Sequence, residues 1–378
     1  MNFANAKPMK DIAIIGAGPA GSQSAYLLAK QGFRVKVFEE HPVIGKPVQC
    51  TGIVTHPFQQ ALGEKDESFV VNKIDTIRIF APNGNSIDFK FRNADWIVDR
   101  TAFDQYLSER AKKAGAEYFT ENHFLDFSKN NGNLSLKIKD IKNNKETTHN
   151  TDILIGADGP QSNVAKSAGI YGNRKFFFGV QPVMKMENNN IIEVYPAKTG
   201  FCWITPINAH TVKAGIAAEE QANQQLKEFM LHRFGPNYRE NLIETEGGLV
   251  PLFNPKQKVQ KENVYLVGDA STAAKATTAG GIIQALISAN SVSEAIIEKK
   301  SYQKLWQKNL GKEMRMSLFM RRMLNKFKDN DYNNIVEWLK NPRARKILEN
   351  YSRDYPSQFA MKLMLAEPRL LTYARYLI

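Results

Sequence analysis

The spacing of apolar positions divides the chain into parts that predict different kinds of structure. Short continuous apolar runs predict strands buried on both faces. Other stretches read as separate half-buried strands, and one of them contains Asn83-Gly84, a pair typical of a hairpin turn. A polar stretch rich in Asn and Lys predicts an exposed hairpin, and from about Tyr302 the apolar residues recur with a helical period. The buried runs lie at 12–15, 153–155 and 264–267, the half-buried strands at 66–91 and within 171–219, and the polar hairpin at 128–150.

The first buried run belongs to a strand–turn–helix–strand pattern over residues 11–39. The turn has the form G-x-G-x-x-G: Gly16 makes the tight turn, Gly18 lets the backbone approach a pyrophosphate, and Gly21 lets helix and strand pack closely. Glu39 lies 23 positions after Gly16, where an acid accepts the hydroxyls of an adenosine ribose. A glycine turn in an ordinary βαβ unit is the alternative, but strand, helix and acid together favour a dinucleotide site.

The other two buried strands also run into polar glycine turns. Asp158 follows the strand within 152–162, and Gly268-Asp269 ends the strand within 263–270. Gly280-Gly281 then opens a helix that is predicted to run to about Glu298. The free N–H groups and positive dipole end of that helix suit a negative charge developing on a bound ring.

Two further residues are candidates for chemistry, each with a plainer alternative. Cys50 lies at the centre of a Gly/Pro-rich loop, where it either takes part in chemistry or fills a small gap. Arg100 precedes a helix predicted over 103–114. It either reaches a phosphate or a flavin edge or is a solvated surface charge.

The length of 378 residues predicts one large or two intertwined domains, with the composition of a soluble globular protein. Two cysteines imply no disulfide framework and favour a cytoplasmic location. No apolar run reaches the roughly 18 residues of a spanning helix, and the first ten residues lack a signal peptide's apolar core. We predict an α/β fold with a discontinuous dinucleotide-binding domain (1–65, 92–170 and 245–300), a β-sheet substrate domain (66–91 and 171–244) and a basic helical region (301–378).

The positive charge is concentrated at the C-terminal end. Residues 299–378 hold 18 Lys plus Arg against 7 Asp plus Glu, a net +11 of the chain's +13. This asymmetry indicates an anionic partner. Interleaved Met and Leu favour a membrane surface over nucleic acid, so we expect peripheral membrane attachment. Six of the eleven methionines lie here, and they either line an apolar channel or form plain core.

Three segments together, Gly16–Glu39, Asp152–Ser162 and Gly268–Ala270, resemble the FAD-dependent family of para-hydroxybenzoate hydroxylase type. The resemblance implies a Rossmann-like FAD-binding domain joined to a β-sheet substrate domain. The first segment would bind the ADP half of FAD, the Asp158 segment would support the cofactor, and the Gly268-Asp269 segment would hold the ribityl chain.

The runs PVQCTGIVT and KATTAGGIIQAL are similar to the geranylgeranyl reductase family, which saturates isolated C=C bonds of isoprenoid chains. This likeness covers most of the chain. It implies that Cys50 lies beside the flavin and takes part in catalysis. The positions that would contact FAD are Ala20, Glu39, Cys50, Thr51, Gly52, Arg100, Asp269, Gly281 and Ile282.

The family's substrate motif, P-x-x-Y-x-W-x-F-P, is only partly matched by PAKTGFCWITP. Trp203 and Pro206 match, Phe201 replaces the tyrosine, and Thr205 replaces the phenylalanine; Pro196 lies two residues too far away. We expect Phe201, Trp203 and Pro206 to contact an isoprenoid. The departure leaves chain length and headgroup open.

The resulting hypothesis is an FAD-dependent reductase of a geranylgeranyl or related polyprenyl chain, with no metal. Its electron donor (NAD(P)H, ferredoxin or quinol) is open, and no second dinucleotide motif indicates a nicotinamide domain. A flavin monooxygenase or halogenase is the main alternative, since some halogenases carry a W-x-W-x-I-P run. A redox-neutral isoprenoid cyclase and a non-catalytic, flavin-tuned membrane-binding protein are the others.

Overall fold

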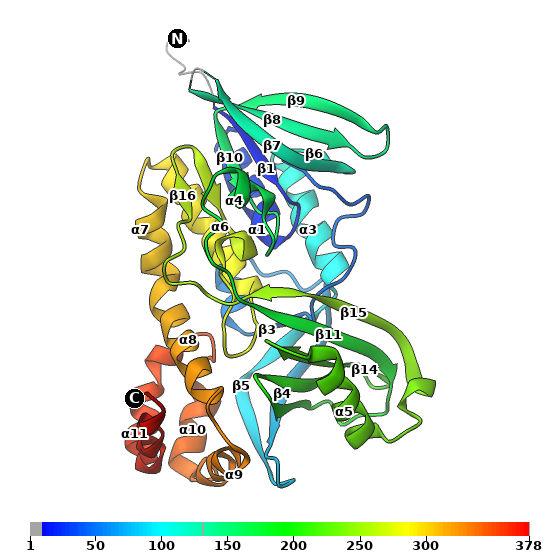
Figure 1. Ribbon diagram of the computed structural model, residues 1–378, viewed down its shortest axis with the longest axis vertical. Helices are drawn as coiled ribbons and strands as arrows, with labels where there is room; N and C mark the ends of the chain where they lie inside the picture. Colours follow the sequence, from blue (N-terminus) through cyan, green and yellow to red (C-terminus); the bar gives the residue numbers. More distant parts are fainter. Residues whose placement is uncertain (1–9, 131, 378) are drawn as a thin grey trace.

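The computed structural model describes residues 10–130 and 132–377 and contains two sheet-based units bridged by C-terminal helices (Figure 1). The first unit is built on a six-stranded sheet of order β16–β17–β10–β1–β2–β6. Its strands are parallel except that β16 runs against β17. They span β1 (Asp11–Ile15), β2 (Arg34–Phe38), β6 (Glu117–Phe119), β10 (Ile153–Gly156), β16 (Gln260–Lys261) and β17 (Val264–Leu266).

Both faces of this sheet are covered, which explains the continuous apolar runs. Ile12 and Ile14 pack on one side in a core shared with α1 (Pro19–Lys30) and α6 (Ile282–Ile297). Ala13 and Ile15 pack on the other side against a three-stranded antiparallel sheet. The first side also contains part of α3 (Arg100–Lys113), and the covering sheet is β7 (Asn122–Asn130), β8 (Asn133–Asp140) and β9 (Lys145–Thr151). The hairpin predicted at 128–150 is confirmed by the antiparallel pairing of β8 with β7 and β9, but the prediction that it is exposed is wrong, because β8 buries Leu134, Leu136 and Ile138.

The second unit is an eight-stranded sheet of order β15–β11–β14–β13–β12–β4–β5–β3. The pair β12–β4 is parallel and the other pairs are antiparallel. The sheet extends beyond the predicted segments, since β5 continues to Val98 and β15 to Pro251. The strands are β3 (Ile53–Val54), β4 (Val70–Phe80), β5 (Ser86–Val98), β11 (Phe176–Lys185), β12 (Ile192–Ala197), β13 (Gly200–Asn208), β14 (Thr211–Ala218) and β15 (Leu242–Pro251); α5 (Ala222–Phe234) packs on one face.

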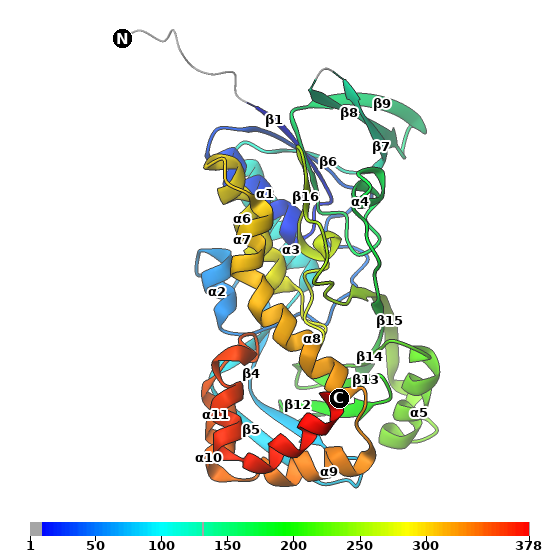
Figure 2. The ribbon, with the colours of Figure 1, turned by 60° about the vertical axis from the view of Figure 1, so that its left-hand side comes forward.

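The C-terminal helices connect the two units. Tyr302, Trp306 and Met314 lie in the core of the first unit, and Leu318 of the same helical run packs against both this core and the cluster of Phe177 and Ala217. Figure 2 shows the run of α7 and α8 passing from one unit to the other. The sequence of helices is α7 (Tyr302–Trp306), a π-helical turn (Gln307–Gly311), α8 (Lys312–Leu324), α9 (Asp329–Trp338), α10 (Pro342–Asn350) and α11 (Ala360–Ala366). Two short helices, α2 (Pro57–Leu62) and α4 (Asn163–Ser167), complete the α-helices of the described residues. Within these residues, no helix has the length and apolar character needed to cross a bilayer.

Candidate functional site

The parallel strands bring the sequence-predicted cofactor residues to one edge of the first sheet. The turn at Gly16, the acid Glu39 and the residues Asp158 and Gly268 follow the carboxyl ends of β1, β2, β10 and β17. In open parallel sheets, ligands bind at this edge. The fold therefore assembles one site from segments that lie far apart in the sequence.

The glycine turn has the shape of a pyrophosphate cradle. A Cβ at Gly21 would lie 2.0 Å from the carbonyl oxygen of Gly16, so the start of α1 packs directly on the turn. A Cβ at Gly18 would meet no atom within 4 Å, so the space above Gly18 is open. Gly18 immediately precedes the first turn of α1, whose free N–H groups favour an anion.

Glu39 closes the other side of this turn. Its carboxylate accepts hydrogen bonds from the Ala17 N–H at 2.8 Å and from the His41 N–H at 3.0 Å. The side chain is only 12% exposed, so its orientation is fixed. Glu39 is thereby held beside the glycine turn at the end of β2.

The carboxylate of Asp269 accepts no hydrogen bond from the residues that the structure describes. The residue is half-buried. Burial raises the pKa of Asp269 to about 6, although Arg100 and Arg174 act to lower it. Gly281, the residue before α6, lies next to it, since a Cβ there would be 3.2 Å from Asp269 Oδ1. Such a carboxylate suits a ligand that brings hydroxyl donors.

Other predicted cofactor residues are near this edge in different roles. Asp158 accepts hydrogen bonds from Ser162 Oγ at 2.6 Å and the Val164 N–H at 2.9 Å, so its carboxylate holds the start of α4. Burial raises the pKa of Asp158 in spite of these donors. Ala20 and Gly268 touch closely, since a Cβ at Gly268 would lie 2.8 Å from Ala20 Cβ.

The loop that carries Cys50 is anchored to the second sheet. Thr51 Oγ1 donates to Gln181 Oε1 at 2.7 Å, and Gln181 Nε2 donates to Glu246 at 2.6 Å. Lys213 Nζ donates both to Glu246 at 2.8 Å and to the carbonyl oxygen of Cys50 at 3.3 Å. The thiol itself accepts from the Gly52 N–H at 3.4 Å. This network fixes Cys50 relative to the second sheet.

Arg100 is the first residue of α3 rather than part of the preceding loop, and its guanidinium binds Asp104 at 2.9 Å. Burial acts to lower the pKa of Arg100, but the charge of Asp104 and its hydrogen bonds with Arg100 outweigh burial, so the pKa is raised. Arg100 therefore remains a cation beside Cys50.

An apolar cavity of about 490 Å³ begins at these residues and extends between the second sheet and the C-terminal helices. Cys50, Thr51, Gly52, Gly281 and Ile282 line its end at the first unit. The remainder of the wall is mostly aliphatic and aromatic, from β4, β5, β12, β13, α9 and α10; examples are Ile77, Phe89, Val194, Tyr332 and Leu348. A pocket of this kind suits a long hydrocarbon chain.

Two of the three predicted substrate residues on β13 line the cavity. Phe201 and Trp203 line the cavity, and the Trp203 ring lies over Gly215, where a Cβ would come within 2.6 Å of the ring. Pro206 is buried further along the strand and is not part of the cavity wall among the described residues. Cys202 points to the opposite face, into the cluster covered by α5.

The tail methionines do not line this cavity in the part of the chain that the structure describes. Met314 belongs to the core, and Met361 and Met364 are exposed. Sequence reasoning missed a buried ion pair on the wall, Lys275 with Asp354. Lys275 stands at the start of the motif KATTAGGIIQAL, but no sequence signal pairs it with a residue of the tail.

The orphan carboxylate of Asp269, the open space above Gly18 and the held acid Glu39 all fit FAD. The fold and site thus define a Rossmann-type flavoprotein with a large apolar cavity. A model described as "FAD binding domain" matches residues 85–298, and one described as "NAD(P)-binding Rossmann-like domain" matches residues 14–54.

Similar proteins specify the family. Digeranylgeranylglycerophospholipid reductase 3 of Methanosphaera stadtmanae is 30% identical over 369 residues, covering 89% of this chain and 92% of the relative. Digeranylgeranylglycerophospholipid reductase of Methanococcus vannielii is 27% identical over 398 residues, covering 97% and 98%. This chain belongs to the digeranylgeranylglycerophospholipid reductase family of FAD-dependent reductases.

The solved structures agree on the fold. A geranylgeranyl bacteriochlorophyll reductase-like protein from Thermoplasma acidophilum has a TM-score of 0.84 at 22% identity, covering 98% of this chain and 99% of that one. The flavin-dependent halogenase CmlS has a TM-score of 0.70 at 17% identity, covering 97% and 78%. The predicted fold class and FAD cofactor are confirmed.

Proposed function

We propose that this protein saturates isolated C=C bonds in the geranylgeranyl chains of a phosphate-bearing glycerol lipid. The observation that carries the proposal is the apolar cavity, which begins at Cys50 and Gly281 beside the cofactor edge and is lined by hydrocarbon side chains. The relatives named digeranylgeranylglycerophospholipid reductase support the same substrate class.

The cofactor roles assigned to individual residues are part of this proposal. Gly18 and the start of α1 receive the pyrophosphate, Glu39 the adenosine ribose, and Asp269 the ribityl hydroxyls. Thr51, Gly52 and Arg100 border the ring, as do Gly281 and Ile282 at the start of α6. When bound and reduced, FAD supplies the hydride for the reduction.

The chain's own contribution is position, exclusion of water and a proton. An isolated alkene has no carbonyl to spread developing charge, so it must be held in near-attack geometry. Phe201 and Trp203 form a wall that orients the chain in the cavity. Cys50 Sγ holds the proton that passes to the second carbon, and the positive end of α6 favours negative charge at the ring.

The test of the function is lipid analysis after co-expression with a pathway that makes geranylgeranyl glycerol lipids. We expect mass increases of two hydrogens for each reduced bond, including under anaerobic conditions. The purified protein with dithionite should do the same without a protein donor. Oxygen consumption in proportion to product, or no saturated product from any prenyl lipid, would contradict the proposal and favour a monooxygenase.

FAD binding is expected to strengthen as the pH rises from 5 to 7. The raised pKa of Asp269, about 6, means that the free protein carries a proton there below pH 6. Ribityl hydroxyls donate best to the carboxylate, so bound FAD lowers this pKa and binding releases the proton. The affinity should rise by roughly tenfold over this range, as measured by flavin fluorescence quenching. Asp269→Asn should flatten the dependence; an unchanged slope in that variant would assign the effect to another group.

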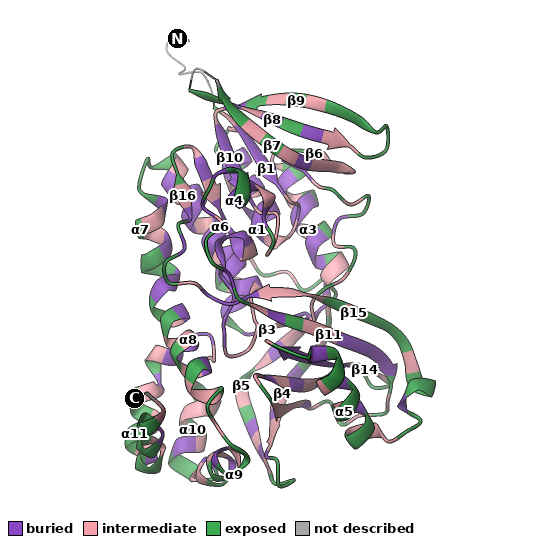
Figure 3. Ribbon diagram, viewed as in Figure 1, coloured by how far each residue is buried: buried purple, intermediate pink, exposed green. Residues whose placement is uncertain are grey.

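We further propose that the protein attaches peripherally to the cytoplasmic face of anionic membranes through α11. This helix has no buried residue, and Met361 and Leu365 are 71% and 76% exposed (Figure 3). Phe359, directly before α11, lines the cavity, so the patch adjoins the proposed substrate site. The basic residues of 299–378 would add on the order of 1 kcal/mol each near such a surface, screened by salt.

Replacing both Met361 and Leu365 by Asp should lower cosedimentation with anionic vesicles by about tenfold or more, since each side chain loses part of a burial gain of about 1.5–3 kcal/mol. Leu231→Asp is the control, because Leu231 is an exposed apolar residue on α5. Equal binding by the double variant and the control would remove α11 as the attachment site.

A further inference from the structure

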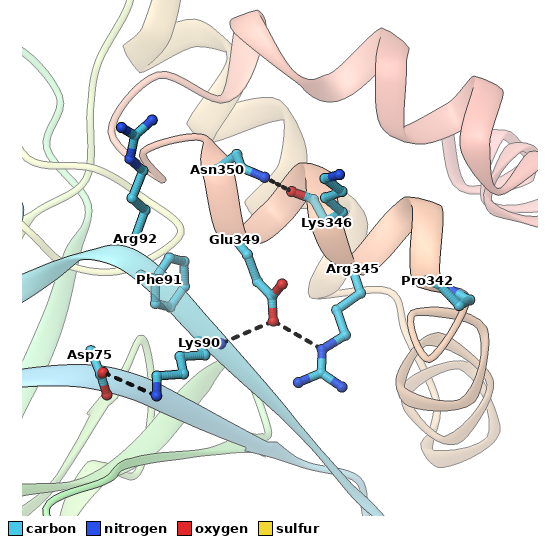
Figure 4. Close-up of a pocket in the computed structure, with 9 residues that line it drawn as sticks. All are labelled: Asp75, Lys90, Phe91, Arg92, Pro342, Arg345, Lys346, Glu349 and Asn350. Carbon is cyan, nitrogen blue, oxygen red and sulfur yellow. Dashed lines mark hydrogen bonds and ion pairs between the residues drawn. The ribbon is translucent and has the colours of Figure 1, made fainter.

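A second concave region lies between the strand β5 and the helix α10 (Figure 4). We call it the basic groove, and its volume is about 690 Å³. Four of its side chains are cations and two are carboxylates. The lining residues are Asp75, Lys90, Phe91, Arg92, Pro342, Arg345, Lys346, Glu349 and Asn350.

The carboxylates of the groove are already engaged. Asp75 lies 3.8 Å from Lys90 Nζ, and Glu349 accepts from Arg345 Nε at 2.9 Å and from the Lys90 N–H at 3.1 Å. Within residues 10–130 and 132–377, neither Arg92 nor Lys346 has a carboxylate within ion-pair distance, in agreement with Figure 4. The groove thus presents two uncompensated cations to solvent.

The groove and the apolar cavity share a wall. Phe91 lines both, and its ring belongs to the same cluster as Leu348, which lines the cavity from α10. Lys90 and Arg92 flank Phe91 on β5 and line the groove with it, at an irregularity where Lys90 pairs with Thr76 and Asp95 pairs with Ile74. On α10, Arg345 and Lys346 line the groove while Leu348 lines the cavity. Phe91 is thus the residue common to the groove and the cavity.

Among the described residues, two of the three cations that line the cavity are paired with carboxylates, and the third, Arg321, donates only to neutral groups. Lys275 is paired with Asp354, and Arg353 is paired with Asp95 at 2.6 Å. Burial acts to raise the pKa of Asp354, but Lys275 and Arg353 outweigh it, so the pKa is held below its usual value. The buried Arg321 donates to the carbonyl oxygens of Ala276 and Thr277 at 2.8 and 2.9 Å.

An amphipathic substrate needs hydrocarbon walls for its chain and a separate cationic place for its phosphate, because burying an unpaired phosphate is costly. We propose that the basic groove binds the phosphate of the prenyl lipid through Arg92 and Lys346, and that the chain enters the cavity beside Phe91. This inference rests on the proposed function. It makes Arg92 and Lys346 determinants of substrate selectivity.

The test measures the binding of two lipids to the purified FAD-loaded protein, with tryptophan fluorescence as the readout. One lipid is digeranylgeranylglycerol phosphate and the other is the neutral digeranylgeranylglycerol. The variant Arg92→Gln with Lys346→Gln should raise Kd for the phosphate lipid by about tenfold or more, since each lost hydrogen bond to a charged group is worth roughly tenfold. Kd for the neutral lipid should stay within about twofold of the parent's, because only the phosphate contacts are lost.

The control variant, Arg322→Gln with Arg343→Gln, removes the same charge from α8 and α10 at exposed residues that do not line the groove. Equal losses in the control would show general charge attraction and overturn the site, as would equal losses for both lipids in the groove variant. Inorganic phosphate is a further arm; if it binds the parent as tightly as the lipid does, the lipid assignment is wrong. If the parent protein reduces neither lipid but the groove variant still loses affinity for the phosphate lipid alone, the proposed reaction is wrong and the phosphate site in the groove is supported.

Discussion

Cys50→Ser is expected to slow reduction of a geranylgeranyl chain by roughly 100- to 10,000-fold, the range of a general acid–base contribution. The thiol lies at the cavity end next to Gly52 and beside the cationic Arg100. Serine has nearly the same volume and can still accept from the Gly52 N–H, so the loop and FAD content should persist. The measurement is a single turnover by pre-reduced enzyme, with thermal stability and flavin content recorded in parallel.

Cys202 supplies a matched control for that experiment. Burial raises the pKa of Cys202 to about 12, and its side chain faces away from the cavity. Cys202→Ala should therefore leave the single-turnover rate close to that of the parent. A near-normal rate for Cys50→Ser would show that Cys50 only fills space in its loop. Loss of FAD from that variant would show that Cys50 acts in cofactor binding instead.

Gly18→Leu is expected to weaken FAD binding by at least about 100-fold while leaving the apoprotein folded. Gly18 has φ −68° and ψ −175°, an extended conformation that leucine also adopts and that suits the residue before Pro19. Its side chain would project into space where no protein atom lies within 4 Å of the Cβ. That space is the proposed pyrophosphate cradle, and losing two charge-assisted hydrogen bonds to it costs about 3–6 kcal/mol.

Gly21→Ala distinguishes an open cradle from a packing contact. Its Cβ would lie 2.0 Å from the Gly16 carbonyl oxygen, so the helix must shift and the free energy of unfolding should fall by about 1–3 kcal/mol or more. Thermal unfolding of both apoproteins, with FAD titration of each, separates the two effects. Parent-like FAD affinity in Gly18→Leu would place the pyrophosphate elsewhere.

The amino-acid sequence by itself determined the first unit and its cofactor. The glycine turn, the helix after it and Glu39 lie within 29 residues of one another, and their conformation follows from local spacing and apolar periodicity. The three buried strands could be found because both faces of their sheet are covered, which makes each run continuously apolar. These local signals, with the motif runs around Cys50 and Gly281, were enough to predict the flavoprotein fold and the reductase family, and both are confirmed.

Only the tertiary structure decided where the cavity runs and which charges are free. Its walls come largely from β4, β5, β12, β13, α9 and α10. No local sequence pattern indicates that these segments lie next to one another. Phe201 and Pro206 lie on one strand, yet only Phe201 lines the cavity, because side chains alternate along β13 and Pro206 falls on the face of Cys202 and Ile204. The tail reads as uniformly basic in sequence, but packing pairs Arg353 with Asp95 and leaves Lys346 unpaired among the described residues. Charge compensation depends on distances across the fold, and these are set by packing rather than by the order of residues.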